Sequence, residues 1–341
     1  MADIYQVNEA YRNKLRAREN AALSEMSRTY GVLQADNLKR LEAVTAAIEE
    51  AQAAGEDISG LSEYMLRLEA LNVQMADQVA VFAPQATDIA TNGQRRAIQL
   101  SLDIQEDLVR AVAGVPQSVS LTADLMWNRL PVEAITNVVG FAADGSPLGA
   151  LFEAIGPFAL DHVTIGIAQG LNPLQVARRM SRTYETLAPS RAATIARTEM
   201  IRANREAQRQ TFEANLSIVR GWRRISAGDV NVCPVCWSLH GDPNPVADVV
   251  PSHPNCRCTV VPITPTYAEL AGLPPGSFDE PEELPTKEEQ FRMLSEAERR
   301  QVLGPSRYRL WETGTPLSAF GKVVPNNEWG PQAVVVPVKE L

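Results

Sequence analysis

The sequence lacks several features that would assign it to a broad functional class. Aromatic residues make up only 6% of the 341 residues, and 41 acidic against 32 basic side chains give a net charge of −9. This balance disfavours the binding of nucleic acid by overall charge. The first residues contain no basic segment followed by an apolar one, and acidic residues interrupt the most apolar stretch, 135–168, before it reaches about 20 apolar residues. We therefore expect a soluble protein that is not secreted and has no membrane partner.

Cysteine is absent from most of the chain, because all four cysteines lie between positions 233 and 258. A disulfide scaffold spreads its cysteines across the fold, and an ordinary cytosolic protein scatters them as small core residues. A cluster of this kind is typical of a set of metal ligands.

The N-terminal half has the apolar spacing of helices. In residues 1–83 apolar side chains recur every three, four or seven positions, and Gly55 and Gly60 separate a first helix from a second one. This pattern predicts a helical hairpin arm that contacts a partner protein. Pro84 ends the second helix, and residues 84–170 form a further helical region.

Residues 171–265 combine helices with strands. Asn172 and Pro173 mark the start of one helix, and a longer helix runs from about Pro189 to Asn215. Residues 218–225 and 257–263 have the composition of strands. These segments predict a small α+β domain.

Residues 266–341 are predicted to form a proline-rich linker and a C-terminal tail. Ser295 and Glu298 match a capping box that opens a short helix, which ends before Gly304. The whole chain is therefore expected to have a mostly α, α+β fold. An N-terminal helical hairpin or bundle precedes the small α+β domain with its Cys/His knuckle, and an extended tail follows.

Five side chains offer metal ligands within the cysteine segment. The two-residue spacer between Cys233 and Cys236 lets both sulfurs bind one tetrahedral ion. His253, Cys256 and Cys258 then compete for two remaining positions, so a closed zinc site is either Cys₄ or Cys₃His. Side chains two apart in an extended segment point to opposite faces, which favours His253 with Cys256.

Zinc with a structural role is the predicted occupant of this cluster, and His240 is a weaker sixth ligand. Reduced thiols stabilised by packing and a disulfide pair are the alternatives. The His-x-Glu that zinc deaminases carry before Pro-Cys-x-x-Cys is missing, as are His-Glu-x-x-His, Gly-x-Ser-x-Gly and a phosphate loop. We therefore expect no enzymatic activity.

Arginine is concentrated between positions 178 and 224, where eleven Arg and four Glu give a local charge of +7. On the predicted long helix, one face carries small residues and the opposite face carries arginines, namely Arg191, Arg202, Arg205 and Arg209. These arginines are expected to face outward as contacts for DNA or an acidic partner, because guanidinium groups suit phosphate and carboxylate. A solvated face without a ligand is the alternative.

Several motifs follow one another in an order that resembles a known family. Ile-Ala-Arg-Thr-Glu at 195–199 precedes Trp222, the Cys-Pro-x-Cys at 233–236, Leu-His-Gly at 239–241 and Pro-Ser-His-Pro-Asn-Cys-Arg-Cys at 251–258. This combination resembles the head morphogenesis, or minor head protein, family of tailed bacteriophages, similar to protein F of phage Mu. The resemblance covers about residues 171–263, with shorter matches at 144–148, 170–173 and 301–314.

The resemblance implies a minor structural protein of a phage head that joins the procapsid during assembly, near or on the portal. Its partners would be the portal protein and capsid or scaffold proteins, and a role in DNA packaging or ejection would bring it to phage DNA. Its location would be the head interior or portal vertex of the virion, and the host cytoplasm during assembly. The alternative function is that of a zinc-containing nucleic-acid-binding protein acting outside the particle.

Overall fold

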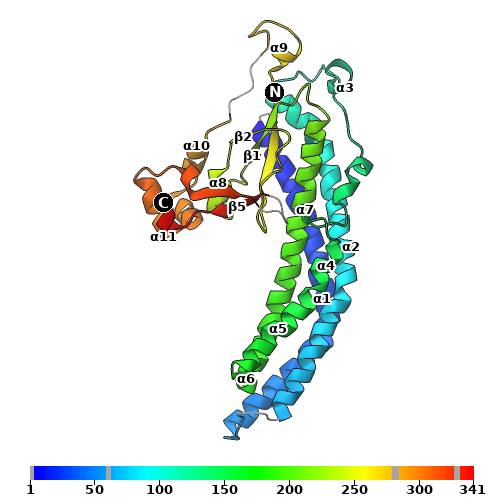
Figure 1. Cartoon of the computed structure of the whole chain (residues 1–341), viewed down its shortest axis with the longest axis vertical. Coiled ribbons are helices and arrows are strands. Elements are labelled where there is room, and N and C mark those ends of the chain that lie inside the picture. Colours follow the sequence, from blue (N-terminus) through cyan, green and yellow to red (C-terminus); the bar gives the residue numbers. More distant parts are fainter. Residues whose placement is uncertain (1–3, 59–62, 279–283, 326–330) are drawn as a thin grey trace. The chain divides into compact units, whose positions relative to one another are not determined.

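The computed structural model describes residues 4–58, 63–278, 284–325 and 331–341 (Figure 1). Two compact units divide the chain, and each combines distant stretches of sequence. Unit 1 comprises Met1–Arg18, Gln94–Val139 and Met200–Leu341, whereas unit 2 comprises Glu19–Gly93 and Gly140–Glu199.

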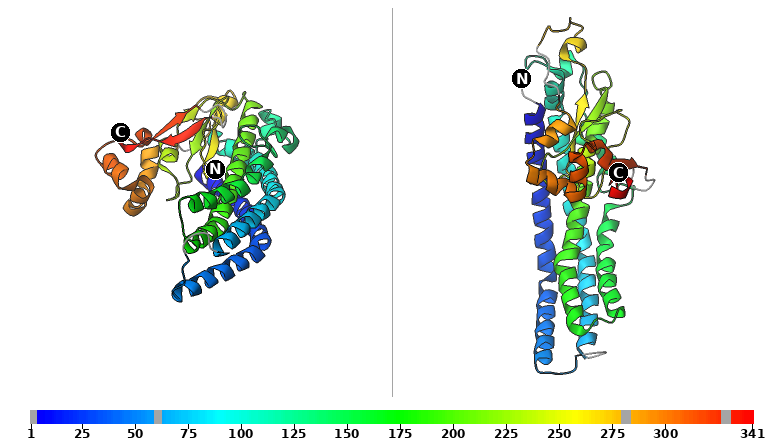
Figure 2. Two further views of the ribbon diagram at one scale, coloured as in Figure 1. Left: turned by 60° about the horizontal axis from the view of Figure 1, so that its bottom comes forward. Right: turned by 90° about the vertical axis from the view of Figure 1, so that its left-hand side faces the viewer.

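The predicted N-terminal helical pair is confirmed. It consists of α1 (Ile4–Ala53) and α2 (Glu63–Ala113), which run antiparallel (Figure 2). Gly55 follows α1 with a positive φ of 79°, as a glycine after a helix often does. Gly60, the second predicted breaker, lies outside the described residues.

The break predicted at Pro84 is wrong, because α2 continues through it as one helix of 51 residues. Pro84 itself is exposed, and its neighbours Phe82, Ala83 and Ala86 are buried. Burial of this face on both sides of Pro84 outweighs the backbone hydrogen bond that proline cannot donate.

Unit 2 is a helical bundle with polar contacts in its core. Tyr30 Oη donates a hydrogen bond of 2.5 Å to the carbonyl of Tyr184, and Tyr184 Oη donates to Asn72 Oδ1 at 2.7 Å. Asn172 and Gln175 form a capping box, as expected of a helix that begins at Pro173. Besides α1 and α2 the unit contains α4 (Leu148–Glu153), α5 (Ile155–Ala168), α6 (Pro173–Ser181), the π-helical η2 (Arg182–Leu187) and the start of α7 (Ala188–Glu213).

One helical stretch of the described chain, Leu148–Ala168, is long and apolar enough to cross a membrane by length and composition alone. Core helices of water-soluble proteins meet the same two criteria, and a third of the most apolar part of this stretch is buried. On its buried side, Gly156 approaches the backbone of α2 so closely that an added Cβ would lie 2.9 Å from the Ala76 carbonyl oxygen.

Unit 1 contains a three-stranded antiparallel sheet in the order β2-β1-β3. Its strands are β1 (Gly221–Ile225), β2 (Pro243–Asn244) and β3 (Thr259–Ile263), so both predicted strands are confirmed. Trp222 and Val260 belong to one apolar cluster and Ile225 and Val261 to another, which places hydrophobic core on both faces of the sheet. The short elements of the unit are α3 (Leu121–Asp124), η1 (Val132–Val138), α8 (Pro234–Ser238) and α9 (Tyr267–Leu270).

The C-terminal region is folded, contrary to the predicted extended tail. It forms α10 (Lys287–Arg292), α11 (Glu296–Glu312), η3 (Leu317–Phe320), the hairpin of β4 (Gly321–Val324) and β5 (Gln332–Val335), and η4 (Val338–Glu340). The Phe291 ring lies 5.0 Å from that of Trp237 in α8 and 5.2 Å from that of Trp311. The predicted stop at Gly304 is a kink with a φ of 72°, after which helical structure resumes. These large apolar side chains fold the region onto α8.

Candidate metal centre

Two short segments of unit 1 carry the five predicted ligands. Cys233 is the N-cap residue of α8, Pro234 occupies the first helical position, and Cys236 lies one turn further on. The Cys236 N–H donates to the Cys233 carbonyl at 3.0 Å, which closes this turn. The second segment is the loop before β3, where the Cys256 N–H donates to the His253 carbonyl at 3.2 Å. Each segment therefore presents its ligands from a tight turn.

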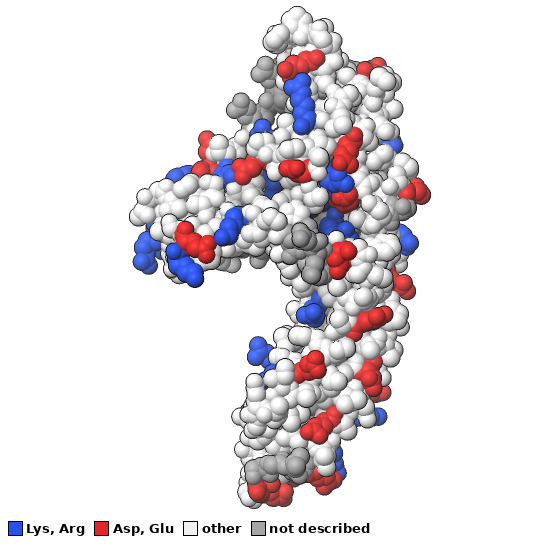
Figure 3. Space-filling view, viewed as in Figure 1, with Lys and Arg blue, Asp and Glu red and all other residues white. Residues whose placement is uncertain are grey.

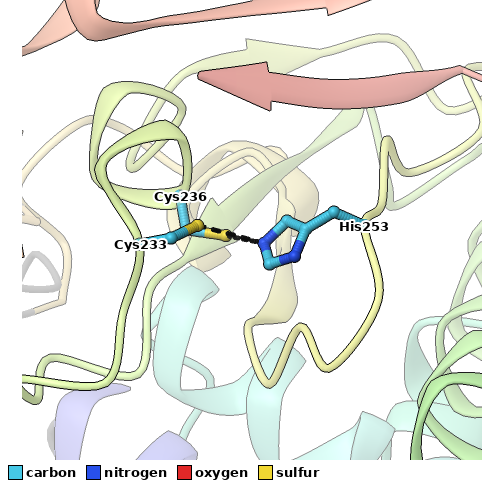
Figure 4. Close-up of side chains that lie close together, drawn as sticks. All are labelled: Cys233, Cys236 and His253. Carbon is cyan, nitrogen blue, oxygen red and sulfur yellow. Dashed lines mark hydrogen bonds between the residues drawn. The ribbon is translucent and has the colours of Figure 1, made fainter. Parts of the chain in front are cut away.

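The side chains of the two segments meet in a compact group, which we call the Cys/His cluster (Cys233, Cys236, His253, Cys256 and Cys258). His253 Nε2 lies 3.1 Å from the sulfurs of both Cys233 and Cys236, and Figure 4 shows the imidazole pointing between them. The Cys236 sulfur lies 3.5 Å from that of Cys256. Three thiols and one imidazole thus converge, with the donor types and number that a closed tetrahedral site requires.

Cys258 also joins the cluster. The sulfurs of Cys236, Cys256 and Cys258 lie within 4.8 Å of one another, as do the ligand atoms of Cys233, Cys236 and His253. The expectation that Cys256 and Cys258 point to opposite faces is therefore wrong. Asn255 has a left-handed φ of 61°, and Cys256 precedes β3 rather than belonging to it, so the alternation of an extended strand does not apply. The Cys/His cluster could hold a metal ion.

His240, the weaker sixth candidate, is fully buried and belongs to neither ligand group. Its Nδ1 accepts a hydrogen bond of 3.0 Å from the Ser226 N–H. Burial, together with the positive charges of Lys287 and Arg12, lowers the pKa of His240 to about 4. The side chain is consequently a neutral core histidine.

The ligands strongly perturb one another's ionisation. The hydrogen bond with Cys236, followed by that with His253, lowers the pKa of Cys233 to about 5, although burial opposes the shift. Burial acts to lower the pKa of His253, but hydrogen bonds with Cys233 and Cys256 outweigh it and raise the pKa to about 10. Proton-bearing imidazole and thiolate therefore stabilise each other when no metal is bound.

The C-terminal region supports both ligand segments. Ser252, next to His253, donates its N–H to the Pro331 carbonyl at 3.2 Å and accepts from the Ala333 N–H at 3.0 Å. Gly321, at the start of β4, packs directly against Val235 and Ser238 of α8. Both turns of the Cys/His cluster thus contact the β4–β5 hairpin.

The prediction that Arg205 faces outward is wrong, because the residue is only 3% exposed. Its guanidinium donates to the Cys258 carbonyl, to Ser252 Oγ at 2.8 Å and to the Cys256 sulfur at 2.9 Å. Helix α7 packs against the sheet of unit 1 at this point, so the predicted outward face is covered at Arg205.

Arg224 also contacts the cluster and was not predicted to do so. It is 1% exposed, donates to the Pro251 carbonyl, and lies 3.6 Å from the Cys256 sulfur. Burial acts to lower its pKa, but the thiols of the cluster raise it above the usual arginine value. The two-residue alternation of β1 could have revealed it, since Arg224 shares a face with the buried Trp222.

The other predicted contact arginines have different environments. Arg209 forms ion pairs with Glu206 and Glu213 on the same helix and is half-buried. Arg191 is exposed and lies 4.6 Å from the centre of the Phe158 ring, and Arg202 is half-buried. On the face drawn in Figure 3, basic and acidic side chains are interspersed. A role of Arg191 or Arg202 in binding DNA or a partner stays a prediction.

Part of the chain matches a known protein family. Residues 159–261 match the family model described as phage Mu protein F like protein. The match begins in α5, includes α7 and all five members of the Cys/His cluster, and ends in β3. No curated protein and no solved structure gives a significant match to the chain.

Proposed function

Residues 159–261 form a phage Mu protein F-like segment, and from it we propose that the chain is a minor head protein of a tailed bacteriophage. It joins the procapsid during assembly at or near the portal and takes part in DNA packaging or ejection. It resides in the head interior or at the portal vertex of the virion, and in the host cytoplasm while heads assemble.

The observation that carries this proposal is that the matched segment contains all five members of the Cys/His cluster. It contains the Ile-Ala-Arg-Thr-Glu stretch of α7, the turn at the start of α8, and the loop that supplies His253, Cys256 and Cys258. The turn that carries Cys233 and Cys236 and the loop that carries the other three ligands are separate in the sequence and converge there in one cluster. The family match and the convergence of these side chains in the fold together support the proposal more strongly than the sequence match alone.

The proposed role of the Cys/His cluster is to hold a structural zinc ion. Cys233, Cys236, His253 and Cys256 are the favoured ligands, because contacts of 3.1, 3.1 and 3.5 Å link them in a continuous series. Sulfur and imidazole nitrogen are the donors that zinc takes in closed sites. Five ligand candidates for four positions leave no need for an open position, so the proposed protein is structural and has no enzymatic activity.

The helical arm is the proposed contact with the portal, capsid or scaffold proteins. Within unit 2 it exposes four large apolar side chains, at 50% or more each, namely Val32, Leu66, Val73 and Val81. A Leu66→Gln/Val73→Gln double variant is expected to keep its helix content and to enter particles less often. The control is Met293→Gln, which removes an even more exposed apolar side chain from outside the arm.

The test of the function is mass spectrometry of purified particles of the phage whose genome encodes the chain. We expect the chain at low copy number in both empty procapsids and virions, with fewer copies than the major capsid protein. Its absence from both kinds of particle would contradict the proposal. Binding to non-specific DNA with a steep salt dependence, without co-purification with particles, would instead support the nucleic-acid-binding alternative.

A further inference from the structure

Two buried guanidinium groups contact the Cys/His cluster, and within the described part of the chain neither is paired with a carboxylate. Arg205 of α7 and Arg224 of β1 find only sulfur, hydroxyl and carbonyl acceptors among the described residues. Placing an ionised group in the protein interior costs free energy that an anionic partner must offset. The thiols are the groups in contact that can supply this negative charge.

Both arginines converge on one sulfur of the cluster. Arg205 Nη2 donates to Cys256 Sγ at 2.9 Å, and Arg224 Nη1 approaches the same atom at 3.6 Å and Cys236 Sγ at 3.9 Å. The backbone of the ligand loop holds both groups in place, because Arg205 also donates to the Cys258 carbonyl and Arg224 to the Pro251 carbonyl. The guanidinium N–H groups are thereby directed at the sulfurs.

We propose that Arg205 and Arg224 are positioning residues of the metal centre, which donate charged hydrogen bonds to its thiolates and orient Cys256. The inference rests on the metal centre proposed above. Cysteine ligands bind a divalent ion as thiolates, so three of them with a neutral histidine leave a net negative centre. Hydrogen bonds to ligating atoms tune metal affinity, and N–H donation from a charged group is the stronger kind.

This arrangement links the metal to the helices and the sheet. Arg205 belongs to α7 and Arg224 to the central strand β1, whereas Cys256 belongs to the loop before β3. A bound ion keeps Cys256 as a thiolate and so maintains both charge-assisted contacts. Metal binding consequently fixes α7 and β1 against the ligand loop.

The test uses the full-length chain with Arg205→Gln and Arg224→Gln as separate variants and Arg205→Lys as the charge-conserving one. Arg220→Gln is the matched control, because Arg220 is exposed directly before β1. Zinc affinity is measured by competition with a chromophoric chelator. Co²⁺ is then substituted, and its ligand-field and sulfur-to-cobalt charge-transfer bands are recorded, since these bands respond to the environment of the sulfurs. Circular dichroism measures the folded fraction of every variant.

We expect each Gln variant to bind zinc about 10- to 100-fold more weakly and to shift the charge-transfer band. Arg205→Lys should recover part of the affinity, and Arg220→Gln should match the parent. Unchanged affinity and an unchanged spectrum in folded Arg205→Gln would overturn the inference while leaving the metal centre intact. A parent chain that binds neither zinc nor cobalt would overturn the metal centre itself. If Arg224→Gln does not fold, Arg205→Gln and Arg205→Lys decide the question.

Discussion

The contact between Gly321 and α8 offers a sharp test of the folded C-terminal region. Gly321 begins β4 with φ −142° and ψ 152°, values that any residue adopts, so alanine would cause no backbone strain there. Its added Cβ would nevertheless lie 2.1 Å from Ser238 Oγ and 2.8 Å from Val235 Cα. The Ser238 hydroxyl can rotate away, whereas a main-chain atom can move only with α8.

We expect Gly321→Ala to destabilise the protein by about 3 kcal/mol, the upper end for overpacking of a close-packed site. For a unit of about 200 residues this corresponds to a fall in Tm of roughly 6–12 °C. The strain falls on α8, which contains Cys236, so the variant should also bind metal more weakly. Gly31→Ala should have the opposite sign, because no atom lies within 4 Å of the added Cβ, and alanine favours an α-helix such as α1 by about 0.5–1 kcal/mol.

Calorimetry and urea unfolding of the parent and of both variants measure these effects. A folded Gly321→Ala with the parent's Tm and metal affinity would refute the packing of β4 against α8. A destabilised Gly31→Ala would show that the comparison does not isolate the steric contact.

Three further predictions concern other contacts. Glu19 is buried and pairs with the partly exposed Arg197, so Glu19→Gln should lower the free energy of unfolding by about 1–3 kcal/mol in urea titrations. The control is Glu63→Gln in the exposed pair with Arg67, which should change this free energy by less than about 0.5 kcal/mol. The pKa of His240 falls from 6.5 to about 4 on folding, so between these pH values the unfolded chain takes up a proton that the folded chain excludes. The free energy of unfolding should therefore fall as the pH drops from about 6.5 towards 4. Urea titrations at each pH should show a weaker pH dependence over this range in His240→Gln. Tyr184→Phe should cost about 1–2 kcal/mol in the same assay, because Asn72 Oδ1 loses its buried donor, and an unchanged midpoint would contradict that hydrogen bond.

Local sequence signals predicted the parts of the fold that depend on neighbouring residues. Asn172 caps the helix and Pro173 fixes the backbone angle of its first residue, and both signals depend only on residues within four positions of each other. The spacing of Cys233 and Cys236 likewise implies a turn with two converging sulfurs. Strand composition around Trp222 and Val260 was sufficient to predict β1 and β3, since both pack against core.

Features that depend on distant partners were not predictable in this way. Pro84 lies within α2 because flanking side chains are buried by other helices, and Arg205 is buried because the sheet covers its face of α7. The C-terminal region folds through the ring of Phe291, which contacts Trp311 nearby and Trp237 of α8, more than fifty positions earlier. Helical periodicity indicates which residues share a face, but it does not indicate what covers that face.

The central structural claim is that the Cys/His cluster holds one zinc ion, and native mass spectrometry of the full-length chain purified without chelator tests it most directly. We predict the mass of the chain plus one zinc, and its loss in Cys236→Ser, with unfolding of the segment 218–263 while the N-terminal helices persist. Such sites contribute on the order of 10 kcal/mol to local folding. The mass of the chain alone, or that mass less two hydrogens for each disulfide, would contradict the claim.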